Sequence, residues 1–361
     1  MEGLNSIPGE QSDMAINETR LNEFLGRAVG DLGAAMSAAL MLVGDRLGLY
    51  KELAKGPITS TDLAQRTDTN ERYVREWLGN QGAGGYVQFD AKANKWSLSP
   101  EQALCLADPN GPVDMPGAYN IVEATFHALG RTLDNFRTGK GMEWGEHSAC
   151  LFHGTERFFR AGYNANLLSS WLPALDGVTD KLKRGAKIAD VGCGYGASTI
   201  LLAKAFPNSE FVGYDYHPAS VAAARERAGG APNARFEAAD ATGYKERDFD
   251  LIAFFDCLHD MADPTGAAKH ARQALKPDGT CMLVEPFAGN RAEENFNPVG
   301  RIFYGASSLI CVPVSLAKNG PALGAQAGEN KLREIVVEKA GFKSLRRAAE
   351  TPFNIILEAK P

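Results

Sequence analysis

The sequence predicts an α/β fold: a mostly parallel, Rossmann-like sheet with helices on both faces, preceded by an all-α, winged-helix domain. From Lys187 onward, short apolar segments alternate with helical patterns, which is typical of a parallel sheet covered on both faces. A glycine-rich turn follows the first segment, and aspartates end the next ones. Strands are expected at 187–192, 210–215, 234–240, 249–256 and 279–285, with a final antiparallel pair at 342–348 and 353–359.

The N-terminal part predicts a winged-helix domain. Apolar residues recur at helical spacing from Leu21 to Leu53, and Gly-Pro at 56–57 ends this helix. The run Thr59 to Ala64 is expected to contain an N-cap and a short helix, and Asn70 is expected to cap a second helix. Two short apolar runs, 86–89 and 95–98, then form a hairpin. Three helices followed by a hairpin make a winged helix.

These patterns divide the chain into four parts. We expect a loose tail at 1–20, the winged-helix domain at 21–105, a helical connector at 106–180 that covers the ligand site, and the α/β domain at 181–361. The apolar segment 290–328 is either a lid over a hydrophobic pocket or an ordinary core helix, and we give the two equal weight.

Composition excludes several classes of protein. The 361 residues carry a formal net charge of -6, which argues against non-specific binding of nucleic acid. Six cysteines are scattered without a C-x-x-C pair, so we expect no metal site and a reducing, cytoplasmic location. No secretory signal is expected. The longest apolar run, Leu32 to Val43, is too short to cross a bilayer, which favours a buried helix and no membrane partner.

The glycine turn is the strongest chemical signal. Asp190 precedes Gly192, Cys193 and Gly194 in the pattern D-x-G-x-G-x-G, which differs from the dinucleotide fingerprint G-x-G-x-x-G and disfavours a dehydrogenase. No lysine follows the glycines, so the turn is not a phosphate-binding P-loop. Cys193 itself is more often a small residue packed under such a loop than a ligand contact.

Acidic residues end the following strands. Asp215, followed by Tyr216, ends the second strand, Asp240 and Ala241 follow the third, and Phe255 lies at the end of the fourth. Each aspartate alone is more often a local cap. Together, at the carboxyl ends of parallel strands, they favour an adenosine ligand with a positive charge rather than a phosphate.

These residues resemble the class I methyltransferases that use S-adenosylmethionine (SAM). The resemblance implies a sheet order of 3-2-1-4-5-7-6, a SAM cofactor that becomes S-adenosylhomocysteine, and a small-molecule acceptor. It also implies that Tyr163 closes over the methionine end of SAM. The implied cofactor contacts are Tyr163, Asp190, Gly192, Cys193, Gly194, Asp215, Tyr216, Asp240, Ala241 and Phe255.

The N-terminal domain resembles two groups within this class. One contains O-methyltransferases of small hydroxylated compounds, which dimerise through such a domain, and the other is a bacterial family of two-domain methyltransferases. In the first group a His-Asp-Trp sequence supplies a general base. His259-Asp260 matches it, while Met261 replaces the tryptophan. His259 is therefore either a base for a hydroxyl acceptor or a residue that binds its own loop, at even weight.

Two other functions remain open on sequence grounds. A winged helix can regulate transcription, yet the charges of the expected recognition helix 70–80 cancel, which makes nucleic-acid binding the weaker hypothesis. A SAM-binding protein that no longer transfers methyl groups is the second.

Overall fold

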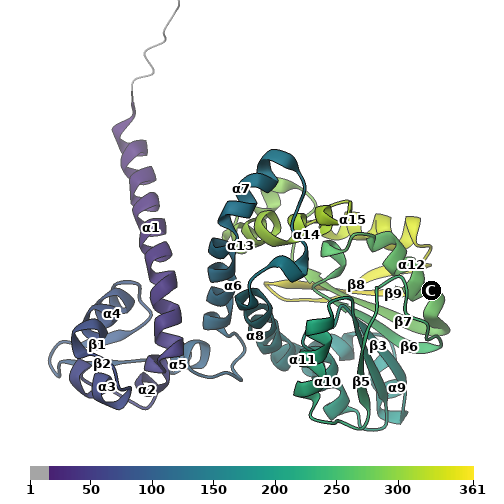
Figure 1. Ribbon diagram of the computed structural model, residues 1–361, viewed down its shortest axis with the longest axis horizontal. Helices are drawn as coiled ribbons and strands as arrows, with labels where there is room; N and C mark the ends of the chain where they lie inside the picture. The colour runs from purple at the N-terminus through teal and green to yellow at the C-terminus, as the bar shows by residue number, and fades with distance from the viewer. Residues whose placement is uncertain (1–15) are drawn as a thin grey trace, which may run out of the picture.

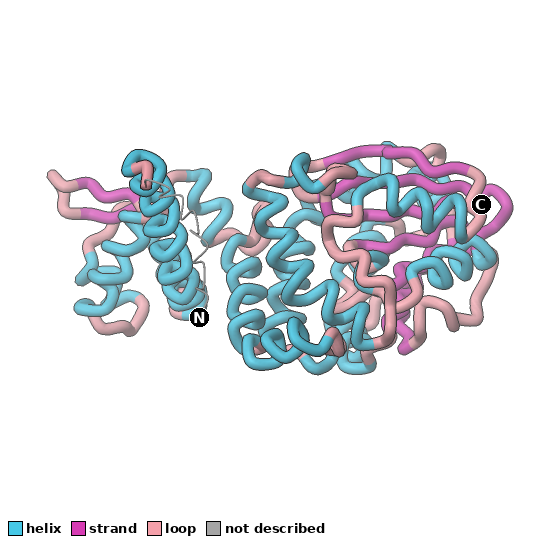
Figure 2. Tube along the Cα trace, turned by 90° about the horizontal axis from the view of Figure 1, so that it is seen from above, coloured by secondary structure: helices cyan, strands magenta, loops and turns pink. Residues whose placement is uncertain are grey.

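The computed structural model describes residues 16–361 and shows two domains joined by helices (Figure 1). Helix α1 projects beyond the small N-terminal domain, and the sheet lies in the C-terminal domain with α6 and α8 between the two. Figure 2, viewed from above, shows the N-terminal helices at one end and the strands of the sheet at the other. This separation confirms the predicted order of the two folds along the chain.

The N-terminal domain has the predicted winged-helix elements. Its elements are α1 Glu18–Arg46, α2 Leu49–Leu53, α3 Ser60–Arg66, α4 Glu71–Ala83, β1 Gln88–Asp90 and β2 Lys95–Ser97. The strands pair antiparallel from Gln88↔Ser97 to Asp90↔Lys95. Asn70 caps α4 through its side chain, as predicted, and Thr59 is the residue of its run that caps α3. Met41, Tyr50 and Trp77 lie in its core.

Helix α1 differs from its prediction in three ways. It begins at Glu18, inside the predicted tail 1–20. Residues 1–15 of that tail lie outside the described residues. It ends at Arg46 because Gly48 adopts a left-handed φ of 71°, so the expected helix 21–53 is two helices. The apolar run 32–43, expected to be buried, is exposed up to Met36. Burial begins at Ser37, where α4 and α6 start to cover the helix.

Two helices of the described chain are long and apolar enough to span a membrane by length and composition. These are α1, of which 22% of the apolar window is buried, and the helical segment 298–317, of which 39% is buried. The exposed half of α1 also carries Glu18, Glu23, Arg27 and Asp31. Charges at this spacing suit the surface of a protein better than hydrocarbon.

The connector is helical, as predicted. It contains α5 Pro100–Leu106, α6 Met115–His127, α7 Leu129–Thr138, a short 3-10 turn Trp144–Glu146 and α8 Ala149–Asn166. Arg157 of α8 binds Asp45 at the end of α1 at 2.6 Å and Asp114, just before α6, at 2.8 Å. These contacts join the N-terminal domain to α8.

The seven-stranded sheet has the order β5-β4-β3-β6-β7-β9-β8. Counted within the sheet, this is the predicted 3-2-1-4-5-7-6. The strands are β3 Lys187–Val191, β4 Glu210–Asp215, β5 Ala234–Ala238, β6 Phe249–Phe255, β7 Leu275–Pro286, β8 Ser344–Glu350 and β9 Asn354–Lys360. All pairs up to β6–β7 are parallel, and β9 pairs antiparallel with both β7 and β8.

Helices cover both faces of the sheet and bury two apolar cores. One core centres on Phe249, Phe254 and the small residues of α12, and the other on Trp171, Leu182 and Phe211. The helices of this domain are α9 Val178–Arg184, α10 Ala197–Ala205, α11 Pro218–Ala228, α12 Pro264–Ala274, α13 Pro298–Ala306, α14 Val312–Ala317 and α15 Gly328–Arg333. The buried centre fixes the carboxyl ends of β3, β4 and β6 side by side, where ligands bind in such sheets.

Candidate active site

The glycine turn joins β3 to α10 in the predicted position. Gly192, Gly194 and Gly196 all have left-handed φ angles, of 79°, 52° and 78°, which residues with side chains rarely adopt. The backbone N–H groups of Gly192 and Cys193 donate to the carbonyl of Tyr214 in β4, at 2.7 and 3.0 Å. A Cβ on Gly192 would lie 2.7 Å from Sγ of Cys257. The turn is therefore held tightly between β4 and β6.

Asp215, at the end of β4, supports this turn. Its Oδ2 accepts from the backbone N–H of Gly194 at 2.9 Å, and its Oδ1 accepts from the backbone N–H of His217 at 2.8 Å. Burial raises the pKa of the Asp215 carboxyl, while the two backbone hydrogen bonds oppose that rise. Each carboxylate oxygen has a second lone pair, so Asp215 can still accept from a ligand.

Asp190 does not line the cavity, contrary to its predicted role as a cofactor contact. It is 1% exposed, and its Oδ2 accepts from the hydroxyls of Ser198 and Thr199, both at 2.6 Å. Burial raises the pKa of Asp190 to about 6, although the hydrogen bonds from Ser198 and Thr199 partly oppose this rise. Oδ1 is buried without a hydrogen-bond partner. Asp190 therefore ties the first turn of α10 to β3 from beneath the glycine turn.

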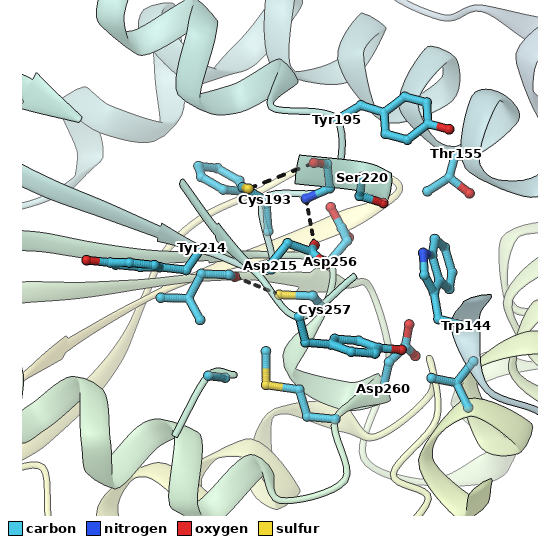
Figure 3. Close-up of a pocket in the computed structure, with 18 of the residues that line it drawn as sticks. Trp144, Thr155, Cys193, Tyr195, Tyr214, Asp215, Ser220, Asp256, Cys257 and Asp260 are labelled. Carbon is cyan, nitrogen blue, oxygen red and sulfur yellow. Dashed lines mark hydrogen bonds between the residues drawn. The ribbon is translucent and has the colours of Figure 1, made fainter. Parts of the chain in front are cut away.

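A cavity of about 350 Å³ opens beside the turn. Figure 3 shows Cys193, Asp215, Asp256, Cys257 and Asp260 around it. Nine of the predicted cofactor contacts line it: Tyr163, Gly192, Cys193, Gly194, Asp215, Tyr216, Asp240, Ala241 and Phe255. The predicted contacts at the strand ends are thus brought together in one place.

The connector supplies a wall of the cavity that no local motif had revealed. Trp144 comes from the short turn before α8, and Phe152, Glu156 and Phe159 come from α8. The rings of Trp144 and Phe152 lie 5.3 Å apart. Val314 and Lys318 enter from the segment 290–328, so a small part of the expected lid does border the cavity. The sequence predicts a helical connector over the ligand site, but it does not single out these side chains.

Tyr163 and Asp256 form the floor of the cavity. The Tyr163 hydroxyl donates to Oδ2 of Asp256 at 3.3 Å, and the Asn354 side-chain amide donates to Oδ1 at 2.6 Å. Burial holds the pKa of Asp256 well above its ordinary value. The ring of Tyr163 packs 5.2 Å from that of Phe255. Asp256 also has a left-handed φ of 51°, a strained angle for an aspartate that its two partners stabilise.

His259 lies behind the cavity wall rather than in it. It is 4% exposed; its Nδ1 is 2.5 Å from Oε2 of Glu285, and its Nε2 is 3.0 Å from Oδ1 of Asp260. Glu285 also accepts from the backbone N–H of Leu258 at 3.1 Å. Burial lowers the pKa of His259, but Asp260 and Glu285 together raise it well above its ordinary value. Of these three side chains, only Asp260 lines the cavity.

Comparison with known proteins identifies both domains. Residues 182–340 match a family model described as a methyltransferase domain, and residues 35–108 match an Rv2258c-like winged HTH domain. Trans-aconitate 2-methyltransferase of Variovorax paradoxus (strain S110) is 38% identical over 114 residues, which is 31% of this chain. This match spans 42% of that protein, so the chain covers less than half of that relative's length.

Two further proteins match nearly the whole chain. O-methyltransferase SfmM3 of Streptomyces lavendulae is 24% identical over 329 residues, 87% of this chain and 94% of that protein. The structure of human N-acetylserotonin methyltransferase in complex with SAM superposes with a TM-score of 0.68 at 16% identity. The superposition covers 98% of this chain and 99% of the human protein's chain, and it shows a shared fold.

Residues 182–340 therefore form a methyltransferase domain, and its sheet order is the one expected for the class I fold. Residues 35–108 add an N-terminal winged-helix domain, so the chain has the two-domain arrangement that the sequence predicts.

The residues around the cavity fit SAM. A Cβ added to Gly194 would meet nothing within 4 Å, so the turn leaves open space for a ligand against its backbone. Asp215 keeps free lone pairs at the position where ribose hydroxyls bind in such folds. Tyr216 offers a ring that is 40% exposed, and Asp240 and Ala241 lie at the same border. The negative side chains suit a cofactor with a cationic sulfur.

Proposed function

We propose that the protein transfers the methyl group of SAM to a hydroxyl oxygen of a small molecule. The observation that carries this proposal is the row Glu285–His259–Asp260, which ends at the wall of the cavity. Methylation of a hydroxyl releases a proton, and a positioned acid–base group speeds such a step. The name of SfmM3 as an O-methyltransferase points the same way.

The residues of the chain have separate tasks in this reaction. When bound, SAM would supply a methyl group on a positively charged sulfur that would retain the bonding electron pair. Asp215 and the glycine turn would hold the cofactor, and Trp144 and Phe152 would keep water away from the acceptor. The hydroxyl proton leaves to the pair formed by Asp260 and His259, while the oxygen takes up the methyl group.

This assignment modifies the role that the sequence suggests for His259. With carboxylates at both ring nitrogens, the imidazole is held as a cation, which has no free lone pair to take a proton. We therefore place the proton on the Asp260 carboxylate and let His259 stabilise the pair through Glu285. His259 remains essential, because it fixes the orientation of Asp260.

Transfer of labelled methyl from SAM into a pooled extract of small metabolites tests the reaction. We expect His259→Gln to slow transfer by about 10²–10⁴-fold, the usual range for acid–base groups, with unchanged affinity for SAM. His270→Gln is the matched control, because His270 binds the Tyr244 carbonyl outside the cavity. An unchanged rate in His259→Gln would make His259 structural. No labelled product from the wild type would favour a SAM-binding protein without transferase activity.

We propose that the winged helix does not read nucleic acid. Both arginines at the start of α4 are paired within the helix: Arg75 with Glu71 at 2.6 Å, and Arg72 with Glu76 at 2.5 Å. Arginines that already pair with carboxylates attract phosphates weakly. A gel shift with random duplex at low salt should show no complex, and a complex would support a regulatory role.

We propose instead that the N-terminal helices pair two copies of the chain. Apolar side chains remain exposed along one side of α1 and on the facing side of α6 and α7. They are Leu21, Phe24, Leu25, Val29, Leu32 and Met36 on α1, and Val122, Phe126, Leu129, Leu133 and Phe136 on α6–α7. An apolar cavity lies between α1 and α6. An exposed surface of this extent usually marks an interface, and a two-fold dimer would cover both faces at once.

Light scattering after size exclusion tests the dimer. The wild type should run at twice the chain mass, and the double variant Leu32→Asp with Phe126→Asp as a monomer. Tyr73→Asp is the control, because Tyr73 is 80% exposed on α4. A monomeric wild type at micromolar concentration would contradict the proposal.

We also propose a cytoplasmic location. All six cysteines are free thiols, which is typical of a reducing compartment.

A further inference from the structure

We infer that the acceptor is uncharged or cationic, and that Asp260 selects it against anionic molecules. The inference rests on the methyl-transfer function proposed above. It concerns which molecules the cavity admits, and it comes from the charges that line the cavity.

Acidic side chains outnumber basic ones in the lining of the cavity. The six acidic side chains are Glu156, Asp215, Asp240, Asp256, Asp260 and Asp263, whereas Lys318 is the one lysine or arginine among the described residues that line the cavity. Lys318 is itself engaged: its Nζ lies 3.9 Å from the centroid of the Tyr216 ring and 3.8 Å from the Glu143 carboxylate. The lining therefore offers no unengaged cation to an acceptor carboxylate.

Several of the carboxylates are already occupied. Glu156 binds Arg160 at 2.9 Å and Arg227 at 2.7 Å. Asp215 holds the glycine turn, and Asp256 lies between Tyr163 and Asn354. Asp240 accepts from the backbone and hydroxyl of its own neighbour, Thr242. Such contacts reduce what these groups can do to an acceptor.

Asp260 is less compensated than Glu156. Among the described residues its charged partner is His259, at 3.0 Å, and that cation is shared with Glu285. Its buried Oδ1 accepts no hydrogen bond of good geometry. In the view of Figure 3, Asp260 and Trp144 lie on the side of the cavity away from Cys193 and Tyr214. An acceptor that enters past Trp144 therefore meets a carboxylate beside an aromatic face, a combination that attracts cations.

A like charge at this position would be repelled. Specific sites reject wrong partners through like charges brought together in poorly hydrated surroundings. The trio of Asp260, His259 and Glu285 carries one cation for two carboxylates, so its net charge is negative. A carboxylate in the cavity would face this field without a counter-ion, while a hydroxyl or an ammonium group can donate to Asp260.

Three phenols of matched shape test the inference. In 2-(2-aminoethyl)phenol, 2-ethylphenol and 3-(2-hydroxyphenyl)propionate, a two-carbon chain beside the hydroxyl ends in an ammonium, a hydrogen and a carboxylate, so the charge lies close to the hydroxyl that meets Asp260. Calorimetric titration into the wild-type protein saturated with S-adenosylhomocysteine measures each Kd. We expect the amine to bind at least about tenfold more tightly than the propionate, with 2-ethylphenol between them, since like charges at close range cost at least this much.

Asp260→Asn tests whether Asp260 causes the preference. This variant keeps the shape of the side chain. The ratio of the Kd of the propionate to the Kd of the amine should fall at least about fivefold towards one. Asp278→Asn is the control. It removes the same charge as Asp260→Asn, but from a residue that pairs with Lys181 away from the cavity. If Asp260→Asn does not fold, the wild-type ratio alone decides.

Equal or tighter binding of the propionate, or no binding of any of the three phenols, overturns the inference. An unchanged ratio in a folded Asp260→Asn overturns the role of Asp260. Failure of the proposed function is seen separately, as the absence of S-adenosylhomocysteine binding in the titration that precedes the phenols.

Discussion

The backbone N–H of Gly194 donates a hydrogen bond of 2.9 Å to Oδ2 of Asp215. This bond joins the turn after β3 to the end of β4, the two elements that the sequence marks as a cofactor site. Because the carboxylate also accepts from His217, one buried side chain sets the positions of two loops. Loss of Asp215 should therefore disturb the cofactor site through both a ligand contact and the shape of the turn.

Asp215→Ala should weaken SAM binding by about 1.5–3 kcal/mol, the usual range for hydrogen bonds to a charged group. Isothermal calorimetry of the purified variant measures the change. Asp278→Ala removes an aspartate outside the cavity and should bind SAM as the wild type does. An Asp215→Ala variant with wild-type affinity would exclude Asp215 from the cofactor site.

Gly192→Ala should destabilise the fold more than Gly229→Ala does. Both glycines have left-handed φ angles, 79° and 58°, and a left-handed alanine costs roughly 1–2 kcal/mol. At Gly229 the new Cβ meets nothing within 4 Å, whereas at Gly192 it would lie 2.7 Å from Sγ of Cys257. Overpacking of this kind adds about 1–3 kcal/mol.

Urea unfolding of the two variants isolates the clash, since the backbone strain is common to both. Equal losses of unfolding free energy would mean that Cys257 moves aside without cost. Gly192→Ala should also bind SAM more weakly, because the turn must shift.

The sequence predicts what depends on local pattern. Alternating apolar segments place all seven strands of the sheet within a few residues. The central strands are buried and must be apolar, whereas the edge strands β5 and β8 are largely unburied and leave a weaker pattern. The glycine turn and Asp215 are equally local, since backbone angles and strand ends leave a direct trace in the residue types. The same local pattern marks Asp190 as a cofactor contact, but in the structure its carboxylate accepts from Ser198 and Thr199 of the protein itself.

Features that depend on packing between distant segments are not predictable in this way. Trp144 reaches the cavity because α8 packs against the sheet domain, and nothing in the residues around position 144 records that contact. The two carboxylates at His259 come from the adjacent Asp260 and from β7, 26 residues away. A histidine motif alone therefore suggests a neutral base, whereas the fold surrounds the ring with negative charge. The burial of helix α1 is mispredicted for a related reason, since apolar residues look alike in the sequence whether they are buried in a core or exposed, as Leu32 and Met36 are.

Asp190 should make stability depend on pH between about 4 and 6. An unfolded aspartate has a pKa of about 4, and burial raises the pKa of Asp190 in the folded protein to about 6. The protonated form is therefore the one favoured by folding. Its contribution is complete below pH of about 4 and is lost as the pH rises through about 6.

Asp190→Asn removes this titration while keeping an oxygen that can accept from Ser198 and Thr199. The stability of the variant relative to the wild type should rise from pH 4.5 to about pH 6 in urea unfolding and stay level from there to pH 7.5. Asp278→Asn serves as a control, because the hydrogen bond from Lys181 lowers the pKa of Asp278 out of this range. A difference between Asp190→Asn and wild type that stays constant with pH would contradict the raised pKa.

Arg157→Ala should be among the most destabilising single changes between the two domains. The Arg157 side chain is 16% exposed and binds Asp45 and Asp114, whose side chains are 16% and 4% exposed. Removal of one member of a buried ion pair costs about 3–5 kcal/mol, because the remaining charges are left without a partner.

The exposed pair Arg137–Asp134 provides the control. Arg137→Ala should cost at most about 1 kcal/mol, since Arg137 and Asp134 are 73% and 68% exposed. Differential scanning calorimetry should show a much lower Tm for Arg157→Ala than for Arg137→Ala. Because α8 also carries Phe159 and Tyr163 into the cavity, Arg157→Ala should weaken SAM binding as well. Two variants of equal Tm would mean that water readily replaces the guanidinium and that the N-terminal domain is attached to α8 by apolar contacts alone.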